Sequence, residues 1–305
     1  MISGHSLMMK YVIRPFLYSL IAFTICACQT PGAAAKITST AIPSTITPIP
    51  PTPTFTPVPL AAIVNGEQIT LAQYQAEQVR FRAASGTNLA TEDEQILLGN
   101  LIDQALLVQA AREEGFTVTE SDVQAHIDKL VTELGSTQAL TGWMERYSYT
   151  EEDFRQDLAR SIAAAWMRDQ IIAQVPATAE QVHVRQILLY NSDRANEVYA
   201  QVKAGSDFAV LAGQYDPVTK GDLGWFPRGF LLDPTLEEAA FNLQPGDISE
   251  VIQTKAGFHI LQLLERDPQR LIDPNALLVL QPNAVKDWLE THRGQSQIQI
   301  LLSQS

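Results

Sequence analysis

The spacing of apolar residues changes at Pro176, and that change constrains the fold more than any other feature of the sequence. Before Pro176, apolar residues recur at helical intervals, most clearly between Ile96 and Val108. After it, residues 182–189 alternate and include several β-branched side chains, a pattern typical of a strand. The chain is therefore predicted to fold as an all-helical region followed by a domain of the α+β class.

Capping and turn residues predict where the elements of the first region begin and end. Residues 61–70 read as a strand, an Asn65-Gly66 turn and the start of a helix with Thr70 as its N-cap residue. The helix that contains Ile96 is expected to end at Gly115. Further helices are expected near Glu120, over residues 136–146 and from Thr150.

The region after Pro176 is predicted to hold a small antiparallel sheet. The expected order is β-α-α-β-α-β-β, with elements at residues 182–189, 194–204, 207–215, 221–225, 235–242, 248–253 and 257–264. Near the C-terminus, residues 285–289 fit a helix and residues 298–300 fit a strand.

The first residues read as an export signal. Lys10 and Arg14 precede an apolar run of about 12 residues, Phe16–Ala27, which is the length of a secretory h-region and too short to span a bilayer. The run ends Ile25-Cys26-Ala27-Cys28, which resembles a bacterial lipobox with Cys28 as the lipidated residue. The alternatives are a conventionally cleaved signal peptide or an uncleaved signal anchor.

Residues 28–59 are predicted to form a disordered linker. The stretch 30–59 contains eight proline and eight threonine residues, a composition that favours extended polyproline geometry over helix or core. No cysteine follows Cys28, which excludes a disulfide framework, a thiol nucleophile and a cysteine-based metal site. The net charge of −13 argues against nucleic acid as a partner, because phosphate binding needs a basic face.

Three motifs in the second region resemble the parvulin family of peptidyl-prolyl cis/trans isomerases. Residues 221–229 read GDLGWFPRG, residues 237–249 read EEAAFNLQPGDIS, and residues 257–261 read GFHIL. The motifs occur in the family's order over residues 181–266. Residues 64–70 also resemble the start of the helical chaperone domain of SurA- and PrsA-like foldases. That architecture implies a C-terminal segment that returns to the helical domain, with residues 298–300 pairing with residues 62–64. The alternative is a frayed C-terminal helix.

This resemblance implies a site made of an apolar proline pocket and a polar network. His259 corresponds to one of the family's two histidines, and Leu231, Leu236 and Phe241 to the pocket residues. Three positions depart from the pattern: Gln186 stands where the family has its other histidine, Ala256 where a serine or threonine is common, and the shortened loop after Tyr215 leaves Asp216 for the Cys/Asp role. Gln186 can still donate and accept hydrogen bonds. The catalytic residues implied are His259, Asp216 and Gln186.

The predicted organisation has five parts: a lipoprotein signal peptide (1–27), the linker (28–59), a helical chaperone-like domain (60–178, completed by 272–305), a parvulin-like domain (179–268) and the returning C-terminal segment (269–305). The predicted function is that of a lipid-anchored extracytoplasmic folding factor that isomerises prolyl bonds in unfolded exported proteins. No cofactor or metal is expected. The alternatives are a holdase that keeps the parvulin fold without catalysis and, least favoured, a solute-binding lipoprotein.

Overall fold

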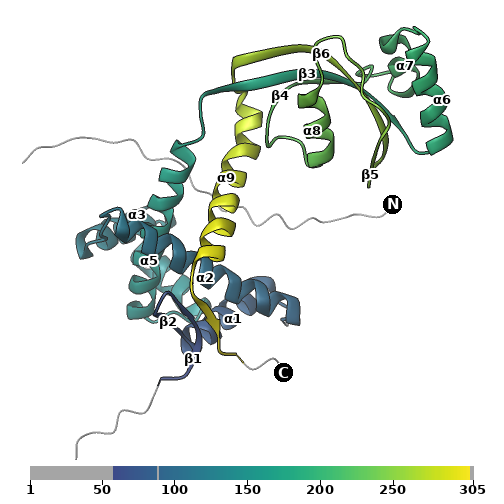
Figure 1. Ribbon diagram of the computed structural model, residues 1–305. Helices are drawn as coiled ribbons and strands as arrows, with labels where there is room; N and C mark the ends of the chain where they lie inside the picture. Colours follow the sequence, from purple (N-terminus) through teal and green to yellow (C-terminus); the bar gives the residue numbers. More distant parts are fainter. Residues whose placement is uncertain (1–57, 88, 303–305) are drawn as a thin grey trace, which may run out of the picture. The chain divides into compact units, whose positions relative to one another are not determined.

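The computed structural model describes residues 58–87 and 89–302 (Figure 1). The predicted signal peptide, Cys28 and the linker up to residue 57 lie outside these described residues. Within the described part of the chain, no helix is both long enough and apolar enough to cross a bilayer.

A three-stranded antiparallel sheet brings together segments that are far apart in the sequence. The hairpin of β1 (Leu60–Val64) and β2 (Glu67–Thr70) turns at Asn65 and Gly66, both of which have positive φ. β7 (Ile298–Ile300) pairs antiparallel with β1, so the strand order is β2-β1-β7. This is the pairing of residues 298–300 with 62–64 that the sequence predicts.

Four of the five helices described before Pro176 begin close to the starts that the sequence predicts. The five helices are α1 (Leu71–Ser85), α2 (Thr91–Glu113), α3 (Glu120–Leu134), α4 (Thr137–Arg146) and α5 (Glu151–Ala173). No start was predicted for α2, which begins at Thr91. The side chains of Thr70, Thr119 and Thr150 each accept a hydrogen bond from the backbone N–H three residues later, which satisfies a donor that has no partner inside the helix.

The core of the helical region is built on α2. Its buried face begins at Leu98, which is 6% exposed, whereas Ile96 is 54% exposed and lies outside the core. One side of α2 packs against β1, and the other side packs against α5. The last helix, α9 (Pro274–Gln295), completes both clusters through Trp288.

The second sheet has four antiparallel strands in the order β4-β3-β6-β5. Its elements follow the predicted β-α-α-β-α-β-β order: β3 (Thr178–Leu189), α6 (Ser192–Lys203), α7 (Phe208–Tyr215), β4 (Asp222–Pro227), α8 (Pro234–Asn242), β5 (Ile252–Thr254) and β6 (Gly257–Leu271). The α+β class predicted from the sequence is confirmed.

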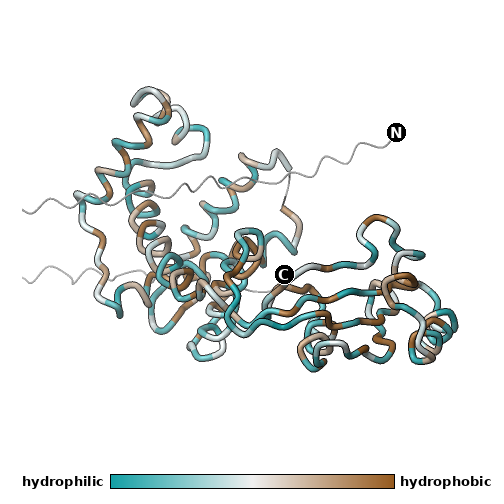
Figure 2. Tube along the Cα trace, turned by 90° about the horizontal axis from the view of Figure 1, so that it is seen from above, coloured by the Kyte–Doolittle hydropathy of each residue, from teal (hydrophilic) through white to brown (hydrophobic). Residues whose placement is uncertain are grey.

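Both faces of this sheet are covered. Ile187 and Ile260 pack against α6 and α7 on one face, while Leu261 and Leu263 pack against α8 and Phe226 on the other. Figure 2 shows apolar and polar stretches following one another along the chain. Because side chains alternate along a strand, His259 lies on the same face of β6 as Leu261, the face that α8 covers.

The strand predicted over residues 248–253 is shorter and later than expected. Ile248 makes only an isolated bridge to Gln262, and β5 is confined to residues 252–254. The Ser249 hydroxyl and the Ser249 N–H both bond to the backbone of Leu261, at 2.8 Å each. A side chain thus takes part of the hydrogen bonding that a regular strand would supply from its backbone.

Candidate active site

His259 is the centre of a small buried polar network on β6. Its side chain is 4% exposed, and both ring nitrogens have partners. Nδ1 lies 3.2 Å from Oε1 of Gln186 on the neighbouring strand β3, and Nε2 lies 2.9 Å from the hydroxyl oxygen of Thr254 on β5. The pairing of three adjacent strands therefore brings His259, Gln186 and Thr254 together.

The hydrogen bonds of this network fit a neutral imidazole. With the Gln186 amide oxygen facing His259, Nδ1 must donate, because that oxygen can only accept. Nε2 of the neutral ring then accepts from the Thr254 hydroxyl, whose oxygen in turn accepts from the N–H of Ala256 at 3.0 Å. Burial lowers the pKa of His259 below its ordinary value, partly offset by the charge of Asp233.

Thr254 was not among the residues predicted from the sequence. The expected strand ended at Gln253, which left Thr254 in a turn and made Ala256 the only position considered for a hydroxyl group. In the structure, β5 extends to Thr254, which pairs with Gly257. Thr254 and His259 consequently lie on the same face, and Thr254 supplies the hydroxyl that Ala256 lacks.

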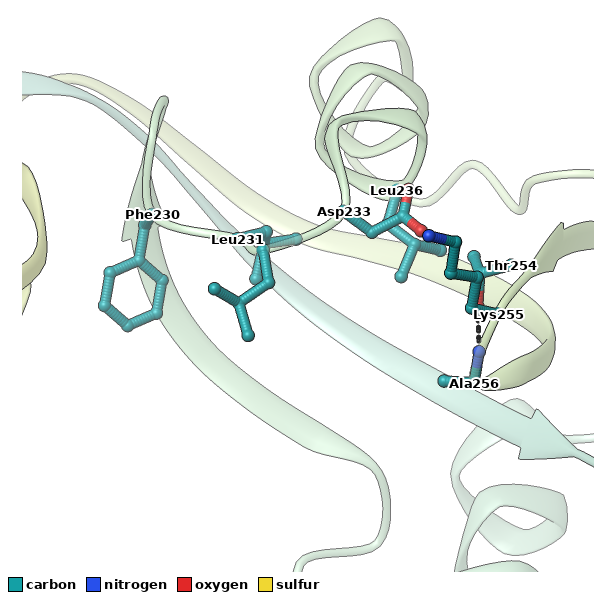
Figure 3. Close-up of a pocket in the computed structure, with 8 residues that line it drawn as sticks. Phe230, Leu231, Asp233, Leu236, Thr254, Lys255 and Ala256 are labelled. Atoms are coloured by element: carbon teal, nitrogen blue, oxygen red, sulfur yellow. Dashed lines mark hydrogen bonds between the residues drawn. The ribbon is translucent and has the colours of Figure 1, made fainter. Parts of the chain in front are cut away.

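An apolar pocket of about 500 Å³ lies beside Thr254. Its lining includes Leu231 and Leu236, together with Phe230, Leu232, Asp233, Thr254, Lys255 and Ala256. Figure 3 shows the side chains of Asp233 and Lys255 pointing toward one another across it. The structure thus places Leu231 and Leu236 at one pocket, with the network residue Thr254 in its wall.

Phe241 lies in the core and not in the pocket wall where it was expected. It is 4% exposed and packs edge-on against Phe226, with ring centroids 6.2 Å apart. The guanidinium carbon of Arg228 lies 4.0 Å from the centre of its ring and covers that face. Phe241 therefore packs α8 onto the sheet, while Phe230 and Leu232 line the pocket instead.

Asp216 follows α7 and organises the loop that leads to β4. Its carboxylate accepts hydrogen bonds from the N–H groups of Val218 and Thr219 and from the Thr219 hydroxyl. These bonds, above all those from Thr219, hold the pKa of Asp216 below its ordinary value. The loop ends at Gly221, whose carbonyl accepts from the N–H of Gln186 at 2.8 Å, so Asp216 shapes the segment that rests on Gln186.

The arrangement is suited to binding rather than to bond cleavage. Thr254 and Gln186 reach His259, but neither is a strong nucleophile, and the network is fully hydrogen-bonded in its neutral form. Among the described residues there is no cluster of three or more His, Cys, Asp or Glu side chains that would hold a metal ion.

Two protein-family models match the chain in succession. Residues 49–168 match the SurA-like N-terminal domain, and residues 190–265 match the PPIC-type peptidyl-prolyl isomerase domain. The second match includes β4, α8 and β5, and it contains both Thr254 and His259. The isomerase domain that the sequence motifs imply is therefore confirmed.

Similar proteins carry the names of foldases and chaperones. The foldase protein PrsA of Caldanaerobacter subterraneus subsp. tengcongensis is 31% identical over 235 residues, which cover 67% of this chain and 72% of the relative. PrsA of Geobacillus kaustophilus is 26% identical, with 57% of this chain and 63% of the relative covered. The crystal structure of PrsA from Bacillus cereus superposes with a TM-score of 0.45 at 21% identity, covering 76% of this chain and 87% of that one. Because the first of these relatives is similar over most of its length and the isomerase domain is present, the chain belongs to the PrsA family of parvulin-type peptidyl-prolyl isomerases.

Proposed function

We propose that this protein is a membrane-tethered extracytoplasmic foldase that isomerises Xaa-Pro bonds in unfolded exported proteins. The observation that carries the proposal is the position of Thr254, which lines the apolar pocket and is hydrogen-bonded to His259. The names of the relatives, foldase PrsA and chaperone SurA, support unfolded polypeptides as the substrate class.

The proposed mechanism needs no covalent step. Rotation about an Xaa-Pro bond is slow because amide resonance sets a barrier of about 18–20 kcal/mol. An enzyme lowers that barrier by binding the twisted amide more tightly than the planar one. Here the apolar walls at Leu231 and Leu236 take the proline ring and exclude water, which weakens the hydrogen bonding that favours the planar amide.

His259 acts on the substrate through Thr254 in this proposal. As a neutral ring it accepts from the Thr254 hydroxyl and holds that hydroxyl in one orientation at the pocket wall. Gln186 fixes the ring from the other side and, unlike a second histidine, does not titrate. We assign Asp216 to the loop that supports Gln186, because its hydrogen bonds from Val218 and Thr219 stay within that loop.

We also propose the five-part organisation given by the sequence, with a lipid on Cys28 as the membrane anchor and residues 28–59 as the tether. The lipobox-like run before Cys28 supports the anchor. Replacement of Cys28 by serine is expected to move the protein from the membrane fraction to the soluble fraction and to abolish labelling with a radioactive fatty acid. Unchanged labelling of the Cys28→Ser variant would contradict the anchor assignment.

A refolding assay tests the isomerase proposal against the alternative of a non-catalytic holdase, which the replacement of a histidine by Gln186 favours. The full chain is added to a client whose refolding is limited by an Xaa-Pro bond, and in parallel to an aggregating client. Faster refolding that is lost in His259→Ala supports the isomerase. If the wild type does not accelerate refolding, and both the wild type and His259→Ala suppress aggregation of the second client, the result supports the holdase.

A further inference from the structure

Glu237, on the first turn of α8, binds three consecutive backbone N–H groups of the loop before the helix. Its Oε1 atom accepts from Gly229 at 2.8 Å, and its Oε2 atom accepts from Phe230 at 3.1 Å and from Leu231 at 3.2 Å. Gly229 has a φ of 81°, a left-handed conformation that helps turn the N–H groups toward one acceptor. A single carboxylate thus closes the loop onto the helix.

This closure joins the two sides of the apolar pocket. Leu231 comes from the loop, and Leu236, which directly precedes Glu237, comes from α8; both line the pocket. We propose that Glu237 is a positioning residue of the isomerase site, which sets the separation of Leu231 and Leu236 and so keeps the pocket open in the free protein. The inference rests on the proposed function, in which that pocket takes the proline ring.

The Glu237 carboxylate accepts three hydrogen bonds from this loop, and Asn283 on α9 adds one more, from its Nδ2 atom to the Gly229 carbonyl at 3.1 Å. The N–H groups of residues 229–231 lie in the loop between β4 and α8, and all three donate to Glu237. Hydrogen bonds to a charged acceptor are about twice as strong as neutral ones, and Glu237 is half-buried. The ring of Phe230 adds an apolar restraint, stacked on Phe226 with centroids 6.3 Å apart.

Loss of Glu237 is expected to change substrate binding more than turnover. A loop that is free before binding must be ordered when the peptide arrives, and that ordering lowers affinity. The polar network, in contrast, lies on β3, β5 and β6 and makes no hydrogen bond to the loop. The effect should therefore appear in KM, while kcat stays close to the wild-type value.

The test uses the full chain with Glu237→Gln, which keeps the side-chain shape but removes the charge and one acceptor oxygen. Glu238→Gln is the matched control, because Glu238 is the next residue, is exposed and forms no ion pair within the part of the chain that the structure describes. For a short peptide with one Ala-Pro bond, KM and the dissociation constant should rise about tenfold in Glu237→Gln, which corresponds to roughly 1.4 kcal/mol. Both should stay unchanged in Glu238→Gln, with kcat within about twofold of wild type in both variants.

Two results would overturn the proposal: a fall in kcat with KM unchanged, or no change in peptide affinity. If Glu237→Gln does not fold, Glu237→Asp replaces it in the test, because aspartate keeps the charge on a shorter side chain. The proposal then requires the same rise in KM in Glu237→Asp. If the wild-type protein shows no isomerase activity, the proposed function itself is wrong. The dissociation constants would then still decide whether Glu237 positions the pocket.

Discussion

Replacement of Thr254 by valine removes one hydroxyl group from the network and leaves the size of the side chain almost unchanged. In the structure that hydroxyl is 2.9 Å from Nε2 of His259 and 3.0 Å from the N–H of Ala256. Ala256 is exposed, so its N–H finds water in the variant. His259 is 4% exposed, so its Nε2 atom is left without a partner.

The expected size of the effect follows from that unpaired nitrogen. Leaving a buried polar group without a partner costs about 1–3 kcal/mol of folding free energy. The unpaired nitrogen costs the free enzyme as much as the complex, so a fall in kcat/KM has a separate cause, the loss of a contact that the Thr254 hydroxyl makes only in the transition state. A contact of similar strength corresponds to a fall in kcat/KM of roughly 5-fold to 150-fold, at about 1.4 kcal/mol per factor of ten. Urea unfolding measures the first quantity, and a protease-coupled peptide assay measures the second.

Thr291→Val is the control for the valine substitution itself, because Thr291 is exposed on α9, far along the chain from the network. It is expected to leave kcat/KM unchanged. The reasoning is refuted if Thr254→Val keeps kcat/KM within twofold of the wild type, since His259 then does not act through the hydroxyl.

Three further predictions concern the loop beside Gln186, the titration of His259 and the packing of the helical region. Gly221→Ala places a Cβ atom 1.9 Å from the Gln186 carbonyl oxygen at a φ of 75°, so it should lower the free energy of unfolding by at least about 1 kcal/mol and reduce kcat/KM; wild-type values would contradict the close approach. Burial keeps the pKa of His259 below 6.5, so on acidification the unfolded chain binds the proton first. The free energy of unfolding should therefore fall as pH drops from about 6.5 toward the folded-state pKa, and urea titrations of His259→Gln should lack this component. Arg293→Ala removes hydrogen bonds to Asp103 at 2.5 Å and to the Gly99 carbonyl at 2.8 Å, and should cost roughly 1 kcal/mol in the same assay; an unchanged midpoint would contradict it.

Much of the fold could be predicted because the helix caps and the short terminal strand are visible in the sequence. Thr70 and Thr150 cap helices where the sequence places caps, and the short strand at residues 298–300 pairs with β1 as expected. The boundaries of β3 and β6 were less accurate. These strands pair from Thr178 with Leu271 to Leu189 with Phe258, and that long register depends on contacts between distant residues that spacing does not report.

The site was predictable only in part. Leu231 and Leu236 line one pocket, and His259 and Gln186 are hydrogen-bonded, as the motifs imply. Thr254 was missed because the side-chain bond of Ser249 displaces β5 toward the C-terminus, which no propensity shows. Phe241 was assigned to the pocket from the family resemblance, and the motifs do not show that Arg228 covers its ring.

Magnetisation-exchange NMR on a peptide with one Ala-Pro bond tests the central claim most directly, because it reads cis/trans exchange without a coupled enzyme. Uncatalysed exchange takes tens to hundreds of seconds and gives no cross-peaks between the isomers at short mixing times. The full chain is expected to produce those cross-peaks, and His259→Ala to abolish them or weaken them at least tenfold while its melting temperature shows a folded protein. Exchange of equal strength with the wild type and with His259→Ala would contradict the account, as would no exchange with either.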